Sequence, residues 1–231
     1  MPVRWTGKKR VALVAVLGMV LGWGSLLEIA SATLITFNFE GNVTSVSPSV
    51  SSYFSTSDQL IGSFTFDSNA PDLSPSIQFG GYQLNQLSFT LGQNSYSPVS
   101  LPTSGISILS NSALGPHPGQ SADSYRVYSD HNIGPSAGLL LPTGFAFSIS
   151  GLNKFPDDSL PLTPPSLANL LSSQRAFSMG FVQPVGAVGN VNGELTSLTL
   201  APVPLPGAVL LFGTGLLGLG ALGRRRSTRL S

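Results

Sequence analysis

The apolar block near the end of the chain restricts what the chain can fold into more than any other feature. Residues Gly207 to Gly223 form a run of seventeen residues without a charged side chain. A helix of this length measures roughly 26 Å, which approaches the ~30 Å hydrocarbon core of a bilayer. We therefore predict a transmembrane helix over 207–223, preceded by a domain that folds in water.

The alternative is a buried C-terminal helix of a soluble domain, and the glycine content argues against it. Six of the seventeen residues are glycine, and each glycine costs an aqueous helix about 1 kcal/mol relative to alanine. Membrane helices carry glycine more often than soluble helices do. Three arginines, Arg224, Arg225 and Arg226, follow the block and oppose its transfer across the membrane. We therefore expect this end of the chain to stay in the cytoplasm.

The order of the segments at this end resembles a known sorting signal. A proline motif precedes the apolar block, and the arginine cluster follows it; the motif consists of Val203, Pro204, Leu205 and Pro206. This order, a proline motif before a short glycine-rich helix and a basic cluster after it, resembles the PEP-CTERM signal of bacterial surface proteins. The match is to the variant of the signal that reads VPLP. The family's name-giving Glu is replaced by Leu205, and Gly207 stands where Ala is usual. The resemblance implies a temporary anchor that an exosortase (archaeosortase in archaea) recognises and processes.

The first 32 residues have the layout of a signal peptide. The first ten residues carry two Lys and two Arg, and an apolar run follows from Val11 to Leu27. Ala30 and Ala32 frame a small-residue cleavage site, so the mature protein would begin at Thr33. A retained N-terminal anchor is the competing interpretation. With the signal peptide removed, the basic start faces the cytoplasm and the middle of the chain is exported.

The charges separate the two ends from the middle of the chain. Residues 33–202 contain three Lys or Arg and nine Asp or Glu, which gives a net charge of 3 − 9 = −6. An acidic domain of this kind argues against binding to nucleic acid, because phosphates need a basic surface. The chain contains no cysteine, which excludes disulfides and thiolate chemistry. We therefore expect one exported domain, 33–202, stabilised by packing, hydrogen bonds or bound calcium.

The middle of the chain is typical of an all-β domain. Phe, Ile, Leu and Tyr alternate with polar residues in short runs that Gly, Pro, Ser and Asn separate, which predicts half-buried strands. The spacing of these runs favours an antiparallel β-sandwich, jelly-roll-like, over a parallel sheet. Leucines at helical spacing predict a single short helix over 165–173. The expected strands cover 33–44, 60–67, 82–91, 105–109, 123–129, 139–149, 176–183 and 193–200.

The chain offers little that would support catalysis or metal binding. His117 and His131 are the only histidines, and neither lies in a nucleophile or base motif. Asp123, Asp130 and His131 would not converge on zinc, because residues seven apart on a strand point to opposite faces. We expect no catalytic residue, no metal site and no cofactor. Calcium remains an open alternative, with the acidic loops 67–72 and 157–158 as its candidate sites.

Binding of carbohydrate is the main rival to a purely structural role. Small β-sandwiches often present aromatic side chains to sugar rings, but both tryptophans, Trp5 and Trp23, lie in the predicted signal peptide. The tyrosines of the exported domain are the remaining candidates. Tyr125 and Tyr128 are three residues apart and should face opposite sides of a strand. The five tyrosines are Tyr53, Tyr82, Tyr96, Tyr125 and Tyr128.

Taken together, these features predict an exported protein of the cell surface or extracellular matrix. We expect it to be held in the membrane by its C-terminal helix, sorted by an exosortase-type enzyme, and structural or adhesive rather than enzymatic. The alternative is a carbohydrate-binding module that acts on exopolysaccharide, and a secreted hydrolase is third. The expected partners are the membrane, the sorting enzyme and extracellular polysaccharide, with no nucleic acid among them.

Overall fold

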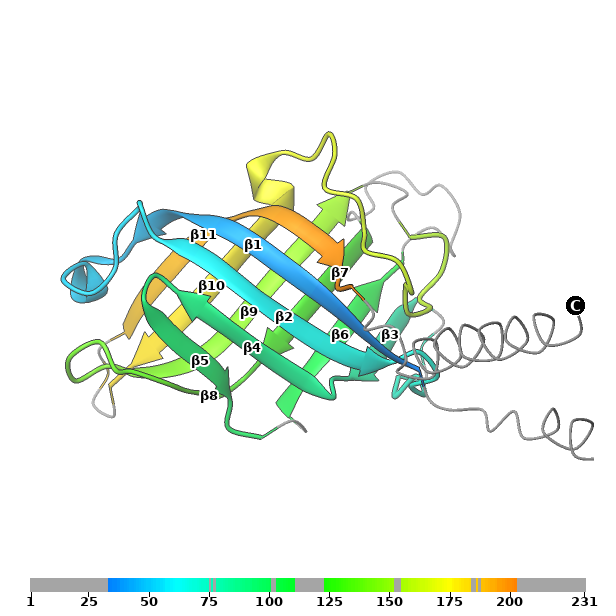
Figure 1. Ribbon diagram of the computed structural model, residues 1–231, viewed down its shortest axis with the longest axis horizontal. Coiled ribbons are helices and arrows are strands. Elements are labelled where there is room, and N and C mark those ends of the chain that lie inside the picture. The colour runs from blue at the N-terminus through cyan, green and yellow to red at the C-terminus, as the bar shows by residue number, and fades with distance from the viewer. Residues whose placement is uncertain are drawn as a thin grey trace, which may run out of the picture.

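A computed structural model describes residues 33–74, 76, 78–100, 103–110, 123–151, 155–183, 186 and 188–202. These residues form an all-β domain of eleven strands, and the only helical elements among them are short 3₁₀ turns (Figure 1). The predicted signal peptide, 1–32, and the predicted sorting tail, 203–231, lie outside the described residues. Within the described part of the chain, no helix is both long and apolar enough to cross a bilayer. The elements are β1 (Leu34–Val46), η1 (Pro48–Val50), β2 (Gln59–Asp67), β3 (Phe79–Gln83), β4 (Gln86–Leu91), β5 (Asn94–Pro98), β6 (Ser104–Leu109), β7 (Asp123–Ser129), β8 (Asn132–Ile133), β9 (Leu141–Gly151), η4 (Ser172–Gln174), β10 (Arg175–Val182) and β11 (Val188–Leu200).

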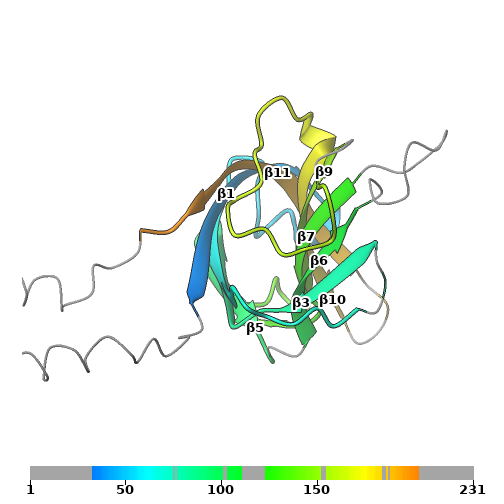
Figure 2. The same cartoon turned by 90° about the vertical axis from the view of Figure 1, so that its right-hand side faces the viewer.

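All eleven strands belong to one antiparallel sheet with the order β3-β6-β7-β9-β10-β11-β1-β2-β4-β5-β8. Figures 1 and 2 show that this sheet curls strongly about its own interior. The prediction of an antiparallel all-β domain is therefore confirmed. The finer prediction, a jelly-roll-like sandwich of two sheets, differs from the structure, in which one sheet supplies both walls of the core.

Register shifts in the long strands help one sheet to take this shape. The β1–β11 ladder shifts between Glu40 and Gly41 and again between Val43 and Ser45. The β9–β10 ladder shifts between Met179 and Phe181. An extra residue in one strand of an antiparallel pair bends that strand and increases its twist. Long strands bent in this way wrap the core without a second sheet.

The core is built largely from phenylalanine. Period-two alternation directs Phe37 and Phe39 of β1, Phe64 of β2, and Phe145 and Phe147 of β9 toward the interior, where all five are buried. Phe37 and Phe64 meet edge to face with their ring centroids 5.5 Å apart, which is a favourable aromatic geometry. Each buried ring contributes roughly 1.5–3 kcal/mol by leaving water. Packing of this kind supplies the stability that a chain without disulfides requires.

Some predicted elements differ from those in the structure. The expected strand 82–91 is divided at Leu84 and Asn85 into β3 and β4, which pair with different neighbours. The sequence pattern also missed β5 and β8. No helix forms over 165–173: Asn169 adopts a left-handed backbone with φ of 61°, and the segment contains only turns and the start of η4. The leucine spacing was therefore a false indication of a helix.

The first and last strands lie side by side. β1 and β11 pair antiparallel, with Phe37 opposite Leu200, and the Ala201 N–H donates to the Thr36 carbonyl over 2.8 Å. The start of β1 and the end of β11 are therefore at the same end of the curled sheet (Figure 1). η1 lies at the opposite end, where it follows the far end of β1.

Candidate functional site

Two rows of aligned residues cross the outer face of the sheet. On β7, β9 and β10 the residues Val127, Phe147 and Phe177 face the core, so their neighbours along each strand face outward. The cross-strand register aligns these outward residues between neighbouring strands. The first row is Ser107, Arg126, Ser148, Ala176 and Glu194; the second row is Gly105, Tyr128, Ala146, Ser178 and Asn192.

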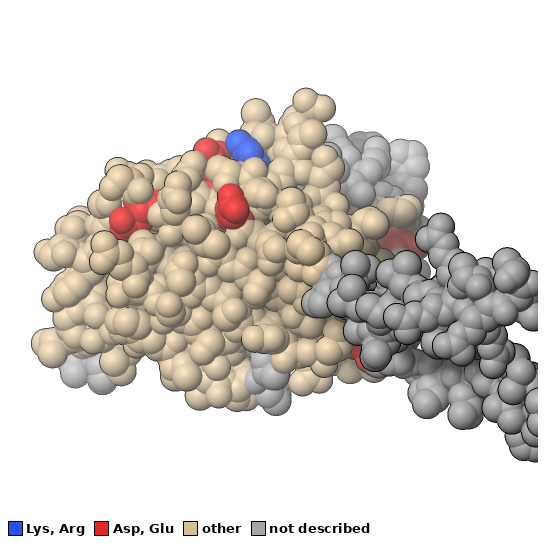
Figure 3. Space-filling view, viewed as in Figure 1, with Lys and Arg blue, Asp and Glu red and all other residues tan. Residues whose placement is uncertain are grey.

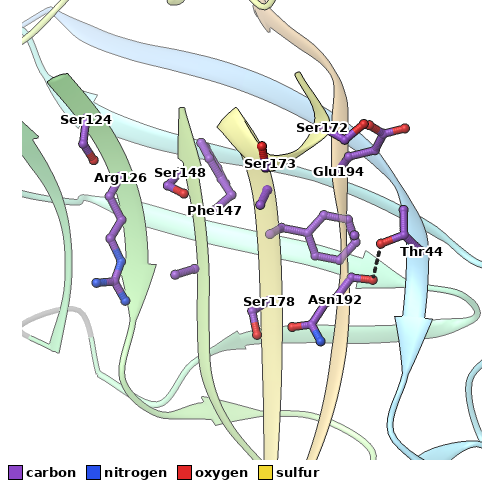
Figure 4. Close-up of a pocket in the computed structure, with 14 residues that line it drawn as sticks. Thr44, Ser124, Arg126, Phe147, Ser148, Ser172, Ser173, Ser178, Asn192 and Glu194 are labelled. Carbon is purple, nitrogen blue, oxygen red and sulfur yellow. Dashed lines mark hydrogen bonds between the residues drawn. The ribbon is translucent and has the colours of Figure 1, made fainter. Parts of the chain in front are cut away.

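A hollow of about 610 Å³ lies over the part of these rows that crosses β7, β9, β10 and β11. Its floor consists mostly of Ser and Ala side chains, which are too short to fill the outer face of the sheet. Ser172 and Ser173 of η4 form part of its wall, and Thr44 closes one side by donating its hydroxyl to the Asn192 carbonyl over 3.5 Å. Figure 4 shows the hydroxyls spread across this hollow, with Arg126 on one side and Asn192 on the other. We call it the serine hollow.

A second hollow of about 440 Å³ lies on the outer face over β3, β6 and β7. Phe79, which is 42% exposed, and Tyr128 give it aromatic walls, and Gln83 adds an amide. Gly105 lies beside the Tyr128 hydroxyl, which would be only 3.0 Å from a Cβ atom at that position. A glycine at this point therefore leaves room for the tyrosine ring. We call this site the aromatic hollow.

Arg126 and Tyr128 lie between the two hollows. They are two residues apart on β7 and face the same side, so Arg126 lines the serine hollow and Tyr128 lines the aromatic hollow. The guanidinium carbon of Arg126 is 5.6 Å from the centroid of the Tyr128 ring, within cation–π range. This contact holds a cation beside an aromatic ring on an exposed sheet face.

The charge of Arg126 is not neutralised by an acid within the described residues. The other described arginine, Arg175, contacts Glu194 at 3.3 Å, whereas Arg126 has no ion pair with any described residue. The described residues contain these two arginines and nine acids, a net charge of 2 − 9 = −7. Figure 3 shows how sparse charged side chains are on one side of the molecule. Arg126 is therefore an isolated cation on an acidic domain.

A third hollow, of about 500 Å³, lies on the outer face of β1, β2, β4 and β5. It is lined by Asn38, Ser63, Ser88 and other uncharged residues, and its charged residue is Glu40. No cation among the described residues lines this hollow and a carboxylate does, so it would bind an anionic ligand more weakly than the two hollows beside Arg126 would.

The residues considered for catalysis or zinc are not brought together. Asp123 is only 2% exposed and accepts the Phe155 N–H over 3.0 Å, whereas Asp130 and His131 are exposed beyond the other end of β7. His117 lies outside the described residues. In the part of the chain that the structure covers, no three His, Asp or Glu side chains are grouped closely enough to hold a metal ion.

The acidic loops suggested for calcium use their carboxylates in local turns. Asp67 accepts the Asn69 N–H over 2.8 Å, and Asp72 accepts the Ser74 and Gly81 N–H groups, each over 2.8 Å. Asp157 accepts from the hydroxyl and the N–H of Ser159, and these bonds lower the pKa of Asp157. The bonds from the residue two positions further along the chain are typical of Asx turns, and the Gly81 N–H bond ties Asp72 to β3.

The tyrosines fall on different sides of the sheet. Tyr125 is buried and Tyr128 faces outward, so the prediction that the two face opposite sides is confirmed. Tyr82 and Tyr96 are also buried, and Tyr53 is exposed near η1. The sequence reasoning missed the pairing of Tyr128 with Arg126. Their spacing of two residues on a predicted strand was the signal that could have revealed it.

The predicted sorting residues Val203, Pro204, Leu205, Pro206, Arg224, Arg225 and Arg226 lie outside the described residues, as do Ala30 and Ala32. Thr33, the predicted first residue of the mature protein, precedes β1, and its carbonyl accepts the Ser68 N–H over 3.0 Å.

Comparisons of the chain with protein-family models, curated proteins and solved structures found no match.

Proposed function

We propose that this chain is an exported protein of the cell surface or extracellular matrix with a structural or adhesive role. In this proposal the C-terminal apolar block, 207–223, holds the protein in the membrane after export. An exosortase-type enzyme then processes the tail at or near the proline motif, 203–206. The protein acts through binding or assembly and not through catalysis.

The observation that carries this proposal is the pairing of the first strand with the last. Because β1 and β11 are antiparallel neighbours, the segments before Leu34 and after Leu200 leave from the same end of the domain (Figure 1). During export, before the predicted cleavage ahead of Thr33, both flanking segments would address the same membrane, and this arrangement supports such a topology. The end that carries η1 would then point away from the membrane and toward other cells or the matrix.

The absence of cysteine from the chain makes this topology directly testable by labelling. Ser52→Cys, an exposed position beside η1, and Ser227→Cys, beyond the arginine cluster, would be made separately in the full-length chain. A bacterium that lacks an exosortase would express them, so that the tail stays intact. We expect a membrane-impermeant maleimide to label Ser52→Cys in intact spheroplasts and Ser227→Cys only after lysis. Labelling of both variants, or of neither, before lysis would contradict the proposed topology.

Processing requires a second measurement in cells that contain an exosortase. Mass spectrometry of the mature protein is expected to find its termini at Thr33 and near Pro206. An intact arginine-rich C-terminus in such cells would mean permanent anchoring and would remove the sorting step. A broad hydrolase screen of the same material tests the prediction that the protein is not an enzyme.

Binding of carbohydrate is a second candidate function, and the outer face around Arg126 favours it. The aromatic hollow offers two rings and the serine hollow offers many hydroxyls, which are the groups that proteins use to hold sugars. This function is compatible with the first one, because a surface protein can adhere through a glycan.

A further inference from the structure

We infer that the outer face around Arg126 and Tyr128 binds a polysaccharide that carries carboxylate groups, such as a polymer of uronic acids. This inference deepens the proposed surface role and rests on it for access to such a polymer. The two hollows that meet at β7 form the site. Arg126 would bind a carboxylate, and the aromatic and serine hollows would hold the sugar residues on either side.

The charge of the ligand follows from Arg126. A guanidinium presents a planar set of donors that matches a carboxylate, and it keeps its charge at every physiological pH. Arg126 has this charge uncompensated among the described residues, while Glu194 in the same hollow is paired with Arg175 at 3.3 Å. The acids elsewhere on the domain would repel a polyanion. A carboxylated polymer would therefore be held at Arg126 and not spread over the surface.

The sugar character of the ligand follows from the aromatic hollow. Phe79 and Tyr128 expose part of their rings there, and Gly81 has no side chain to fill the space beside the Phe79 ring. A pyranose ring has an apolar face of C–H groups that can pack on an aromatic ring, and hydroxyls at its edge. Gln83 lines the same hollow, so its amide is placed to bond such hydroxyls.

The length of the site favours a polymer over a single sugar. From β3 to β11 the site crosses five interstrand steps of about 4.8 Å, or roughly 24 Å in all. Ser148 and Ser178 offer hydroxyls along this path, and Asn192 offers an amide. These groups can bond sugar hydroxyls at several points along a chain. A strand of several sugar residues would use the whole path, whereas a monosaccharide would use only one hollow.

The test compares one polymer with and without its carboxylates. Full-length protein in nanodiscs of zwitterionic lipid would be applied to immobilised polygalacturonate and to the same polymer after chemical reduction of its carboxyl groups. We expect saturable binding to polygalacturonate that weakens as salt is added, and at least ~10-fold weaker binding to the reduced polymer. Free galacturonate should compete at least ~10-fold less well per sugar than the polymer does.

The variants separate Arg126 from the general effect of charge. Arg126→Gln should weaken binding by about 10-fold or more, because it removes the charged partner of the carboxylate. Glu40→Gln/Arg126→Gln restores the original net charge by removing an exposed acid on β1, and it should bind as weakly as Arg126→Gln alone. Phe79→Ala should also weaken binding, because it removes one wall of the aromatic hollow. Circular dichroism and thermal unfolding would check that each variant is folded.

Three results would overturn the inference. They are equal binding of both polymers, binding by folded Arg126→Gln within about twofold of wild type, and recovery of binding in the charge-restored double variant. None of them bears on the proposed topology, which the cysteine labelling tests in cells. Failure of that labelling would leave the polymer binding measurable on purified protein, so the two failures are distinguishable.

Discussion

The hydroxyl of Tyr125 lies inside the curled sheet without a hydrogen-bond partner among the described residues. Its ring packs near Phe155, with the centroids 6.1 Å apart, and burial raises the pKa of Tyr125. A buried hydroxyl without a partner costs about 1–3 kcal/mol. We therefore expect Tyr125→Phe to raise the free energy of unfolding by about 1 kcal/mol, measured by urea denaturation.

The matched control for this substitution is Tyr96→Phe. Tyr96 is also buried, but its hydroxyl donates to the Pro135 carbonyl over 3.3 Å. Removing that bond should lower the free energy of unfolding by about 0.5–1.5 kcal/mol. The two substitutions remove the same atom and should change stability in opposite directions. A loss of stability in Tyr125→Phe as large as that in Tyr96→Phe would show that the Tyr125 hydroxyl is bonded in solution.

At the scale of the strand, Gly62 shows how β1, β2 and β4 fit together. Gly62 faces the core from β2, opposite Phe39. A Cβ atom there would be 2.4 Å from the Phe39 ring and 2.7 Å from the Cβ of Phe89. Because these neighbours are buried, the strands would have to shift. We expect Gly62→Ala to lower the free energy of unfolding by about 1–3 kcal/mol in urea denaturation.

Gly81 of β3 provides the control for Gly62. It also lies within a strand, but a Cβ atom there would meet its nearest neighbour at 3.8 Å, an ordinary contact. Gly81→Ala should therefore change stability by less than about 0.5 kcal/mol, or increase it slightly because alanine restricts the unfolded chain. If Gly62→Ala and Gly81→Ala lower the free energy of unfolding by the same amount, the close approach of Phe39 to β2 is not the cause of the loss in Gly62→Ala.

The strands that the sequence predicted correctly are those in which apolar and polar residues alternate. In β1, β2 and β9 this alternation reports directly which side chains enter the core. β8 is only two residues long and has no such pattern. It is positioned by Asn132, which accepts the Ser129 hydroxyl over 2.8 Å and donates to the Thr143 carbonyl. Contacts made by residues on other strands cannot be read from local periodicity.

At the scale of the whole molecule, the number of sheets could not be predicted from local pattern. A strand with one buried face shows the same alternation in a sandwich as in a single curled sheet. The choice depends on which strands pair, and β3 pairs with β6 and not with its chain neighbour β4. The geometry of the candidate site also depends on which strands pair. Arg126 and Tyr128 could be assigned to one face from their spacing, but the hollows beside them depend on the pairing of β7 with β6 and β9.

The interior of the curled sheet should also determine how the protein responds to alkali. Burial raises the pKa of Tyr96 to about 12 and also raises the pKa of Tyr125. Burial and the nearby charges of Asp72 and Asp158 raise the pKa of Tyr82. In the unfolded chain these tyrosines lose their protons near pH 10. Above that pH the unfolded state therefore binds fewer protons than the folded state does.

Stability should consequently be independent of these groups below about pH 10 and should fall as the pH rises from about 10 toward 12. Each tyrosine that stays protonated only in the folded state lowers the free energy of unfolding by about 1.4 kcal/mol for each pH unit. Urea denaturation at several values between about pH 9 and pH 12 would measure the slope. Tyr96→Phe should reduce it by the share of one tyrosine. An unchanged slope in Tyr96→Phe would contradict the assignment, because a side chain without a phenol cannot contribute a proton to the linkage.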